Sequence, residues 1–360
     1  MASIIVNRVV QREMKDLAFL INGQTFLKSM GPLVYFSNKA GIRPHIIVAK
    51  ERTGKPHDNI NLHTLARLSK SVQDGRLYVV DRFQDIDPVL EQNDLTSFVC
   101  QDAQHHAHEL CEKYRAYSIG VFFDTVHHAN NSTRKISGTR PHRMYYSDQY
   151  FKDEFERQMG ETWNSGVVGA PHLDHAIFIE QKQHTQERVL FLTPIQSTLD
   201  QNTRNELEKF IEYCLDNHIH FIMKDRPKSR WIFNKKGLEE QITLVSHEEG
   251  FPYTSLSLIL NTDLHITSYG TSAFEAQFFG RPVINMEVTD SDQLPLAIRL
   301  IKHSYDTDDI FNNHGLCQTV SSGLIDTYED LKNRSALPRR NLTIDDNFSL
   351  DILRDIAADL

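Results

Sequence analysis

The segment of residues 263–287, DLHITSYGTSAFEAQFFGRPVINME, constrains the fold more than any other part of the chain. It predicts a β-strand, a polar loop over residues 268–272, a helix over residues 273–279 and a second strand. Gly280 fits the position that ends such a helix. A strand, a helix and a second strand in this order are typical of a parallel sheet covered by helices.

The loop of this segment consists mainly of small residues. Gly270, Thr271 and Ser272 would let a phosphate approach the backbone where the helix begins, and the first-turn N–H groups would attract it. Glu275 lies about one turn into the helix, where its carboxylate could accept a hydrogen bond from a sugar hydroxyl. A plain βαβ unit whose loop needs a glycine explains the same residues, and the segment alone leaves both interpretations open.

Strand and helix patterns alternate through both halves of the 360-residue chain. The strands predicted in the first half span 16–21, 45–49, 77–80, 97–100, 118–123 and 143–147, and the helices span 26–40, 62–71 and 103–113. Further strands predicted in the second half span 188–192, 219–224 and 242–246, and further helices span 203–217 and 293–304. This alternation predicts an α/β protein with two Rossmann-like parallel sheets.

A polar stretch at residues 181–187, QKQHTQE, predicts the linker between two domains. We therefore expect a first domain over 1–180, a second over 181–340 and a C-terminal helix over 341–360 that could return to the first domain. Ligands of open α/β sheets bind beyond the carboxyl ends of the strands, so the two domains would face each other across a cleft.

Composition narrows the classes of partner and the compartment. The net charge of −9 argues against a broad nucleic-acid surface. No apolar run reaches the ~18 residues of a membrane span, and the N-terminal residues lack a signal-peptide pattern. The four cysteines are widely separated and form no CxxC pair, as expected of a reduced cytoplasmic protein. Peripheral contact with a membrane and a homodimer both stay open.

A basic turn follows the predicted strand at 219–224. Lys224 and Arg226 would form charge-assisted hydrogen bonds with a diphosphate, bidentate for Arg226. A solvated basic turn explains the same residues, but the loop at 268–272 in the same half favours phosphate binding.

Three polar residues follow the apolar strand predicted at 118–123. Asp124, His127 and His128 carry the carboxylate and imidazole groups that could take a proton from a sugar hydroxyl. The chain has 18 histidines, so a chance pair of neighbours is the alternative.

Other motifs favour no metal ion and no obligatory cofactor. His105 and His108 share a helix face, but no carboxylate or cysteine with ligand spacing completes a site. The acidic run at 306–309 follows a predicted helix and fits an exposed loop. The sequence has no P-loop, no GxGxxG and no GxSxG, so P-loop NTPases, typical dinucleotide folds and serine hydrolases have no motif support.

Several segments together resemble the superfamily of GT-B glycosyltransferases and UDP-N-acetylglucosamine 2-epimerases. SYGTSAFEA at 268–276 and GRPVINM at 280–286 resemble its nucleotide-sugar loop, helix and strand. In the same order along the chain, VGAPHLD at 168–174, RVLFLTPIQS at 188–197 and MKDRPK at 223–228 are similar to other parts of its pattern. CDP-glycerol glycerophosphotransferase-like and lipid-A-disaccharide synthase-like proteins show comparable segments.

The resemblance implies a GT-B fold and a donor site on the second domain. Gly270, Thr271 and Ser272 would bind the donor's phosphates, Glu275 the ribose, and Ser197 and Arg226 would add phosphate contacts. The chain departs from the pattern where relatives often have His-Pro in place of Arg226-Pro, and it lacks the epimerase-type HRREN and GGxxE segments.

We therefore expect a glycosyltransferase that moves a sugar or related group from a UDP- or CDP-type donor to a hydroxyl-bearing glycan or lipid-linked acceptor. Two alternatives remain. One is a UDP-sugar epimerase or hydrolase of the same fold, and the other is a nucleotide-sugar-binding protein without catalysis. Turnover of a UDP-sugar without an acceptor would distinguish an epimerase or hydrolase from a transferase.

Overall fold

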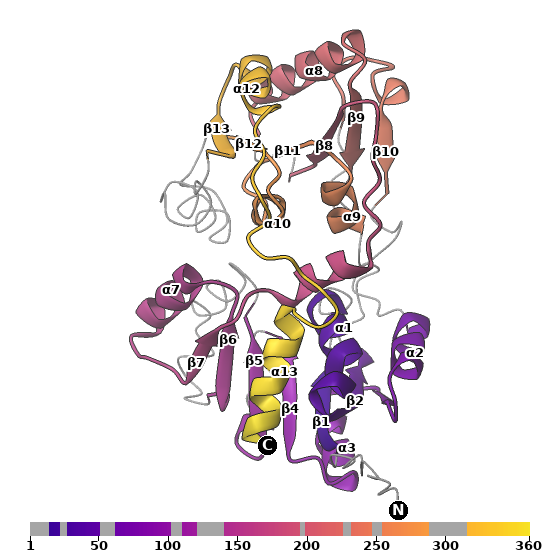
Figure 1. Cartoon of the computed structure of the whole chain (residues 1–360), viewed down its shortest axis with the longest axis vertical. Coiled ribbons are helices and arrows are strands. Elements are labelled where there is room, and N and C mark those ends of the chain that lie inside the picture. The colour runs from indigo at the N-terminus through magenta and orange to yellow at the C-terminus, as the bar shows by residue number, and fades with distance from the viewer. Residues whose placement is uncertain are drawn as a thin grey trace, which may run out of the picture.

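The structure is a computed structural model. It describes residues 14–21, 27–50, 62–101, 110–120, 140–194, 199–225, 232–246, 254–287 and 315–360. These residues form two parallel sheets, one above the other in Figure 1, with helices around each.

The first sheet has seven strands in the order β3-β2-β1-β4-β5-β6-β7, and all of its neighbouring pairs are parallel. Its strands are β1 (Lys15–Leu20), β2 (Ile42–Ala49), β3 (Arg76–Val80), β4 (Ser97–Gln101), β5 (Arg115–Ile119), β6 (Arg143–Tyr146) and β7 (Ser165–Val167). In β1, four consecutive residues are buried, as expected of a strand covered on both faces.

The second sheet has six strands in the order β10-β9-β8-β11-β12-β13, again all parallel. Its strands are β8 (Arg188–Leu192), β9 (His220–Lys224), β10 (Thr243–Val245), β11 (Leu264–Thr267), β12 (Val283–Met286) and β13 (Cys317–Val320). Each sheet starts at its third strand and reverses between its first and fourth strands, which is the order of the doubly wound Rossmann fold. The predicted fold of two Rossmann-like parallel sheets is confirmed.

The helices lie between the strands along the chain. Those of the first half are α1 (Leu27–Phe36), α2 (Leu62–Ser71), α3 (Ile86–Gln92), α7 (Gln149–Met159) and the 3-10 helices η2 (Ser37–Ala40), η4 (Phe83–Asp85) and η5 (Pro171–Phe178). Those of the second half are α8 (Gln201–Asp216), η7 (Glu239–Gln241), α9 (Thr254–Leu260), α10 (Ser272–Phe278), α12 (Leu324–Leu331) and α13 (Phe348–Asp359). None of the described helices is long and apolar enough to cross a membrane.

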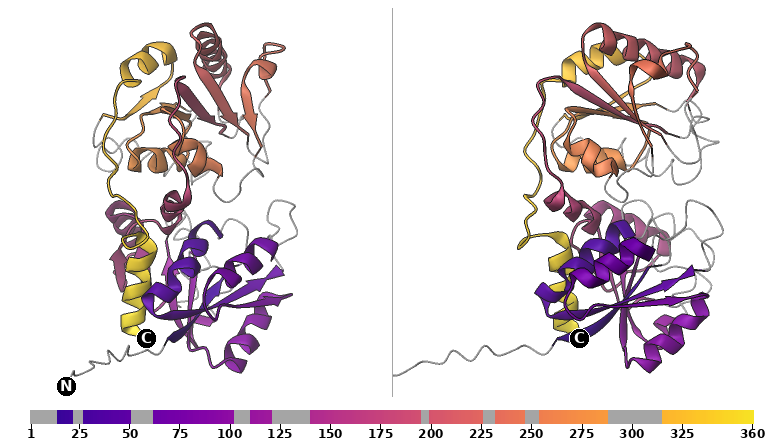
Figure 2. Two further views of the ribbon diagram at one scale, coloured as in Figure 1. Left: turned by 45° about the vertical axis from the view of Figure 1, so that its right-hand side comes forward. Right: turned by 90° about the vertical axis from the view of Figure 1, so that its right-hand side faces the viewer.

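The C-terminal helix α13 lies on the first sheet's side of the molecule (Figure 2). Its Leu350, Ile352, Leu353 and Ile356 are buried in one cluster with residues of α1, β1 and β2. Tyr145 and Tyr117 of that sheet donate hydrogen bonds to Asp355 and Asp359 of α13. The chain therefore crosses from the second sheet back to the first and completes the first core.

The first predicted helix changes character at its end. Residues 27–36 form α1 with Pro32 inside it, and residues 37–40 form η2, which ends at Gly41 in the left-handed region with φ 75°. Proline has no N–H, so the carbonyl of Lys28, four residues earlier, lacks its usual helical partner. Instead, Nε2 of His175 in η5 donates a hydrogen bond of 2.7 Å to that carbonyl.

One predicted strand begins three residues earlier than expected. The pattern favoured 118–123, but β5 spans Arg115–Ile119, and residues 121–123 lie outside the described residues. Apolar content pointed to IGVFF, whereas the register with β4 pairs Ser97 with Arg115 and Gln101 with Ile119. Pairing with a neighbouring strand, rather than local hydrophobicity, decides where this strand begins.

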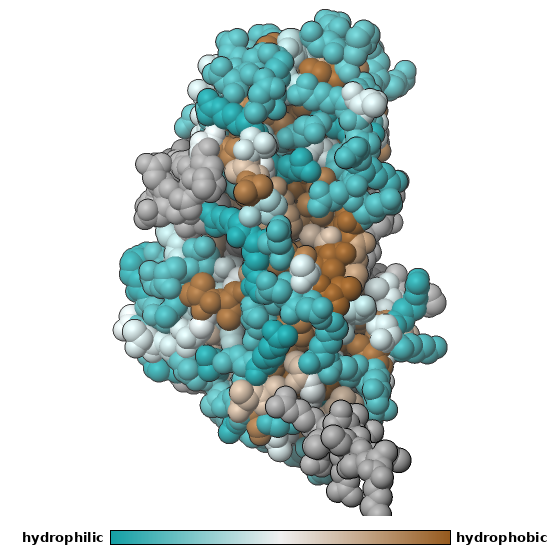
Figure 3. All heavy atoms as spheres, in the orientation of Figure 1, coloured by the Kyte–Doolittle hydropathy of each residue, from teal (hydrophilic) through white to brown (hydrophobic). Residues whose placement is uncertain are grey.

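Figure 3 shows apolar side chains near the middle of the molecule, at the level where the chain passes between the two sheets in Figure 1. A pocket of about 460 Å³ is lined by Leu27, Tyr35, Arg67, His175 and Phe178, among others. A second, of about 430 Å³, is lined by residues of both halves, including Phe151, Phe274, Phe278, Arg340 and Phe348. Neither is lined by residues 268–272.

Candidate functional site

The loop at 268–271 follows β11 at the carboxyl edge of the second sheet. β11 pairs with β8 on one side and with β12 on the other. The strand order reverses between β8 and β11, and ligands of open α/β sheets bind in the crevice outside such a reversal. The fold therefore places this loop where a ligand is expected.

The backbone of the loop is strained. Tyr269 has a φ of 44°, in the left-handed region that residues with a side chain seldom occupy. Its N–H donates a 2.7 Å hydrogen bond to Oδ1 of the fully buried Asn285 in β12. Nδ2 of Asn285 in turn donates to Oγ1 of Thr319 in β13, at 3.2 Å. Strained residues held by their surroundings cluster at functional sites, which supports a role for the loop beyond connection.

Gly270 is needed for space rather than for its φ. A Cβ at this position would lie 2.7 Å from Oγ1 of Thr267 and 3.2 Å from Oγ of Ser272. The two hydroxyls therefore converge on the bare Cα of Gly270. A side chain there would force the Thr267 hydroxyl or the loop to shift.

The first turn of α10 uses most of its own amides. Hydrogen bonds run from the N–H of Ala273 to the carbonyl of Gly270 and from those of Phe274 and Glu275 to the carbonyl of Thr271. Among the described residues, the N–H groups of Thr271 and Ser272 have no partner. Because α10 has seven residues, a ligand would depend on these two amides more than on a helix dipole.

His265 lies beneath the loop, in β11. It is buried, and its Nε2 lies 3.1 Å from Oγ of Ser272. Burial lowers the pKa of His265 to about 4, although the nearby charge of Glu275 acts in the opposite direction. The ring is therefore neutral at physiological pH and fixes the Ser272 hydroxyl by a hydrogen bond.

Glu275 points toward η5, which precedes the second sheet in the chain. Its Oε1 lies 3.3 Å from Nε2 of His172 in η5, and both side chains are largely buried. Burial alone would raise the pKa of the Glu275 carboxyl, but the hydrogen bond and charge of His172, with the charge of Lys28, outweigh it and lower the pKa. Glu275 is therefore a buried, ionised carboxylate beside the loop.

Lys224 ends β9 at the same edge of the sheet. The residue is largely buried, and its carbonyl accepts hydrogen bonds from the N–H and Oγ1 of Thr193, after β8. The structure thus brings Lys224, the 268–272 loop and Glu275 to one edge of one sheet. Their predicted contacts with a donor stay predictions.

The other predicted site residues lie outside the described residues: Asp124, His127, His128, Ser197 and Arg226. Residues 102–109, with the histidines considered for a metal, and residues 306–309 lie outside them too. Within the described part of the chain, no group of three or more His, Cys, Asp or Glu side chains could hold a metal ion.

Sequence reasoning missed the role of η5. Three of its polar side chains bind three different elements: His172 contacts Glu275 of α10, Asp174 binds the start of α13, and His175 binds α1. The sequence signal was the VGAPHLD segment, which was recognised as a pattern but given no contacts.

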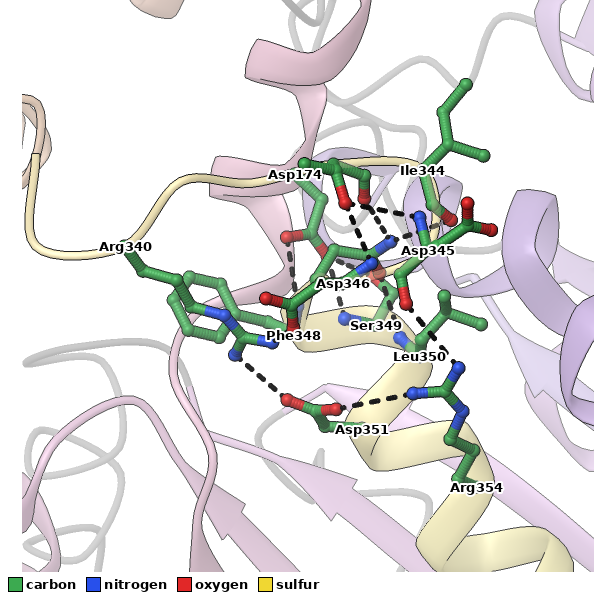
Figure 4. Close-up of polar contacts among 12 residues, drawn as sticks. Asp174, Arg340, Ile344, Asp345, Asp346, Phe348, Ser349, Leu350, Asp351 and Arg354 are labelled. Atoms are coloured by element: carbon green, nitrogen blue, oxygen red, sulfur yellow. Dashed lines mark hydrogen bonds and ion pairs between the residues drawn. The ribbon is translucent and has the colours of Figure 1, made fainter.

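Asp174 binds the N-terminus of α13, as Figure 4 shows. Its carboxylate accepts hydrogen bonds from the N–H of Phe348 at 3.1 Å and from the N–H and Oγ of Ser349 at 2.7 and 2.6 Å. Burial raises the pKa of Asp174 to about 6, against the lowering effect of these hydrogen bonds.

No protein-family model matches the sequence, and no curated protein sequence matches it significantly. Solved structures match along nearly the whole chain. The UDP-GlcNAc 2-epimerase of Methanocaldococcus jannaschii has a TM-score of 0.64 at 16% identity, over 95% of this chain and 99% of that chain. The UDP-GlcNAc 2-epimerase of Neisseria meningitidis, bound to UDP-GlcNAc, has a TM-score of 0.56 at 14% identity, over 96% and 100%.

A UDP-glucosyltransferase from Polygonum tinctorium has a TM-score of 0.55 at 11% identity, over 96% of this chain and 98% of that chain. The 360-residue chain itself has the GT-B fold. The resemblance of the sequence to the superfamily of GT-B glycosyltransferases and UDP-GlcNAc 2-epimerases is confirmed at the level of fold. Identities of this size establish the fold alone.

Proposed function

We propose that the protein is a GT-B enzyme that acts on a nucleotide-activated sugar bound at the 268–272 loop. The observation that carries this proposal is the position of the loop at the reversal of the second sheet, with Tyr269 held in a strained conformation by Asn285. Glu275, an ionised carboxylate about one turn further on, supplies an acceptor for sugar hydroxyls.

The donor's phosphates would lie against Gly270, Thr271 and Ser272, with the two unpartnered amides as hydrogen-bond donors. Lys224, with Arg226 as predicted from the sequence, would neutralise the charge of the departing diphosphate, and Ser197 would add a hydrogen bond to a phosphate. Ribose hydroxyls would bind Glu275.

The reaction that we propose for this enzyme is glycosyl transfer. A hydroxyl-bearing glycan or lipid-linked acceptor would enter over the first domain, and Asp124, His127 or His128 would take its proton. Closure of the two domains would exclude water and so limit hydrolysis of the donor. The proposal uses no metal ion and no cofactor besides the nucleotide-sugar.

A UDP-sugar 2-epimerase is the second candidate, because solved 2-epimerases match over 95% of this chain or more. The two activities differ in what they require. An epimerase converts a UDP-sugar without an acceptor, whereas a transferase needs one. Incubation with UDP-GlcNAc alone, followed by chromatography of the nucleotide-sugars, separates them: a new UDP-sugar excludes the transferase as the principal activity.

The donor site is tested with nucleotides and with Glu275→Ala. Thermal-shift measurements with UDP, CDP, CMP and GDP should show stabilisation by at least one of them. Loss of an ionised acceptor should weaken that nucleotide about tenfold or more, since a hydrogen bond to a charged group contributes about 1.5–3 kcal/mol. Glu206→Ala, a half-buried glutamate paired with Lys209 in the same half, is the control and should bind as the wild type does.

If no nucleotide of the panel shifts the melting temperature, the donor site as proposed is wrong. Unchanged affinity in Glu275→Ala would exclude the ribose role while leaving the phosphate loop in place.

A further inference from the structure

His172 of η5 contacts the proposed donor site through Glu275 of α10. It is buried, and its Nε2 faces Oε1 of Glu275 at 3.3 Å across the boundary between the two sheets. A carboxylate has two oxygens, and contact at Oε1 leaves Oε2 able to accept further hydrogen bonds. His172 therefore fixes the direction of a carboxylate that still has capacity for a ligand.

The imidazole is also the largest of the contributions that keep this carboxylate ionised. An isolated charge in a buried position is costly, and a hydrogen-bonded partner offsets that cost. Among the described residues, His172 is the side chain that both hydrogen-bonds Glu275 and lies within ion-pair distance of it. Removing the imidazole would leave the carboxylate free to turn or to take up a proton.

His172 is itself held by its own helix. Two residues further along η5, the carboxylate of Asp174 binds the start of α13, and the next residue, His175, binds the carbonyl of Lys28 in α1. Lys28 is free to accept that bond because Pro32 has no N–H. The position of His172 is therefore set by two elements of the first domain.

We infer that His172 is a positioning residue of the donor site, which aims the Glu275 carboxylate at the ribose hydroxyls and makes that aim depend on the first domain. This inference rests on the proposed function, because it takes Glu275 as the ribose ligand. It adds a residue of η5 to a site otherwise made by the second sheet, and so connects donor recognition with the placement of the acceptor-side domain.

The distinguishing readout is the preference for ribose hydroxyls. The ligands are UDP or CDP, whichever binds better, and its 2′,3′-dideoxy analogue, with dissociation constants measured by calorimetry. The wild type should prefer the hydroxylated nucleotide by about tenfold or more. His172→Leu should bring the ratio of the two constants close to one, with the dideoxy analogue bound nearly as well as before.

Two further variants distinguish the orientation of the Glu275 carboxylate from a general effect on folding. His172→Gln places an amide nitrogen near the position of Nε2 and should restore most of the preference. His172→Asn keeps a buried polar group one bond shorter, and should lose the preference as His172→Leu does. His220→Leu is the matched control and should keep the wild-type ratio. His220 begins β9 and therefore lies at the amino ends of the strands, opposite the edge of the sheet that carries the loop.

Three outcomes would overturn the inference about His172. An unchanged ratio in His172→Leu and His172→Asn overturns the inference but leaves the donor site in place. A general loosening of the fold would weaken both ligands alike and keep the ratio, which also overturns it. Failure of the wild type to bind any nucleotide of the panel overturns the proposed function itself, and the inference with it.

Discussion

Tyr269 and its neighbour Gly270 are unusual in different ways: Tyr269 in its backbone angle, and Gly270 in the lack of space for a side chain. Tyr269 carries a large side chain in the left-handed region of backbone space, and the buried Asn285 holds it there. Gly270 has an ordinary φ but no room for a Cβ between the hydroxyls of Thr267 and Ser272. A plain βαβ connection requires neither feature, and both support the ligand site proposed at this loop.

Gly270→Ala tests this at the residue scale. The added methyl group would meet Oγ1 of Thr267 at 2.7 Å, so the Thr267 side chain or the loop must shift, at a cost of about 1–3 kcal/mol. We expect nucleotide affinity to fall about tenfold or more while the protein still folds, as measured by calorimetry and by circular dichroism.

Gly166→Ala in β7 is the control for this substitution. Its added Cβ would lie no closer than 3.9 Å to another group, so binding should be unchanged. Wild-type affinity in Gly270→Ala would show that the loop backbone does not contact the ligand.

At the scale of elements, η5 is the connection that joins the two halves. One turn of helix contacts α10 through His172, α13 through Asp174 and α1 through His175. Just before η5, the backbone at Gly169 lies close to the start of α13. Gly169 has a φ of 96°, and a Cβ there would lie 2.2 Å from the ring of Phe348. The segment VGAPHLD thus also serves as a docking site for the C-terminal helix.

Gly169→Ala is therefore expected to disturb the docking of α13. Both the positive φ and the clash with Phe348 oppose the substitution, and together they should cost several kcal/mol, about 1–3 kcal/mol from each. Amide hydrogen exchange followed by mass spectrometry should show faster exchange in α13 and in the α1 segment on which it packs.

Peptides of the second sheet, such as β8 and α8, provide the internal reference for that experiment. Exchange that accelerates equally there would indicate global destabilisation instead of local undocking, and unchanged protection of α13 would contradict the role assigned to Gly169.

At the scale of the whole molecule, buried titratable groups make stability depend on pH. His175 and His265 stay neutral in the folded state because burial lowers the pKa of His175 to about 3 and that of His265 to about 4. Unfolding returns both to about 6.5, so the unfolded state takes up more protons and stability falls as the pH drops below 6.5. Asp174, with its pKa raised to about 6, has the opposite sign and offsets part of this loss.

His175→Gln separates one of these contributions. The glutamine amide can still donate to the carbonyl of Lys28, but it does not titrate. Between pH 7.5 and pH 5 the variant should lose about 2 kcal/mol less stability than the wild type, from the shift of one histidine. Urea unfolding at the two pH values, followed by tryptophan fluorescence, measures the difference. An equal pH dependence in both proteins would mean that His175 is not kept neutral by burial.

Most elements were predictable because their signals are local. Apolar runs flanked by turns marked β8 and β9, and the amphipathic pattern at 203–217 marked α8, observed over Gln201–Asp216. The edge strand β7 and strand β13 gave weak signals: β7 has three residues, none of them buried, and β13 has one buried residue of four. Such strands are defined by the neighbour with which they pair, which a single sequence does not show.

The sequence by itself determined the α/β class, the repeat of a parallel-sheet pattern in two halves and the loop at 268–272, because periodicity and small-residue breaks act over a few neighbouring positions. Only the tertiary structure decided that Glu275 faces His172, that Asp174 binds the start of α13 and that the carbonyl freed by Pro32 binds His175. These contacts join residues about 100, 175 and 147 positions apart. Their energy comes from burial and direction in space, which depend on the whole fold and leave no periodic pattern in the chain.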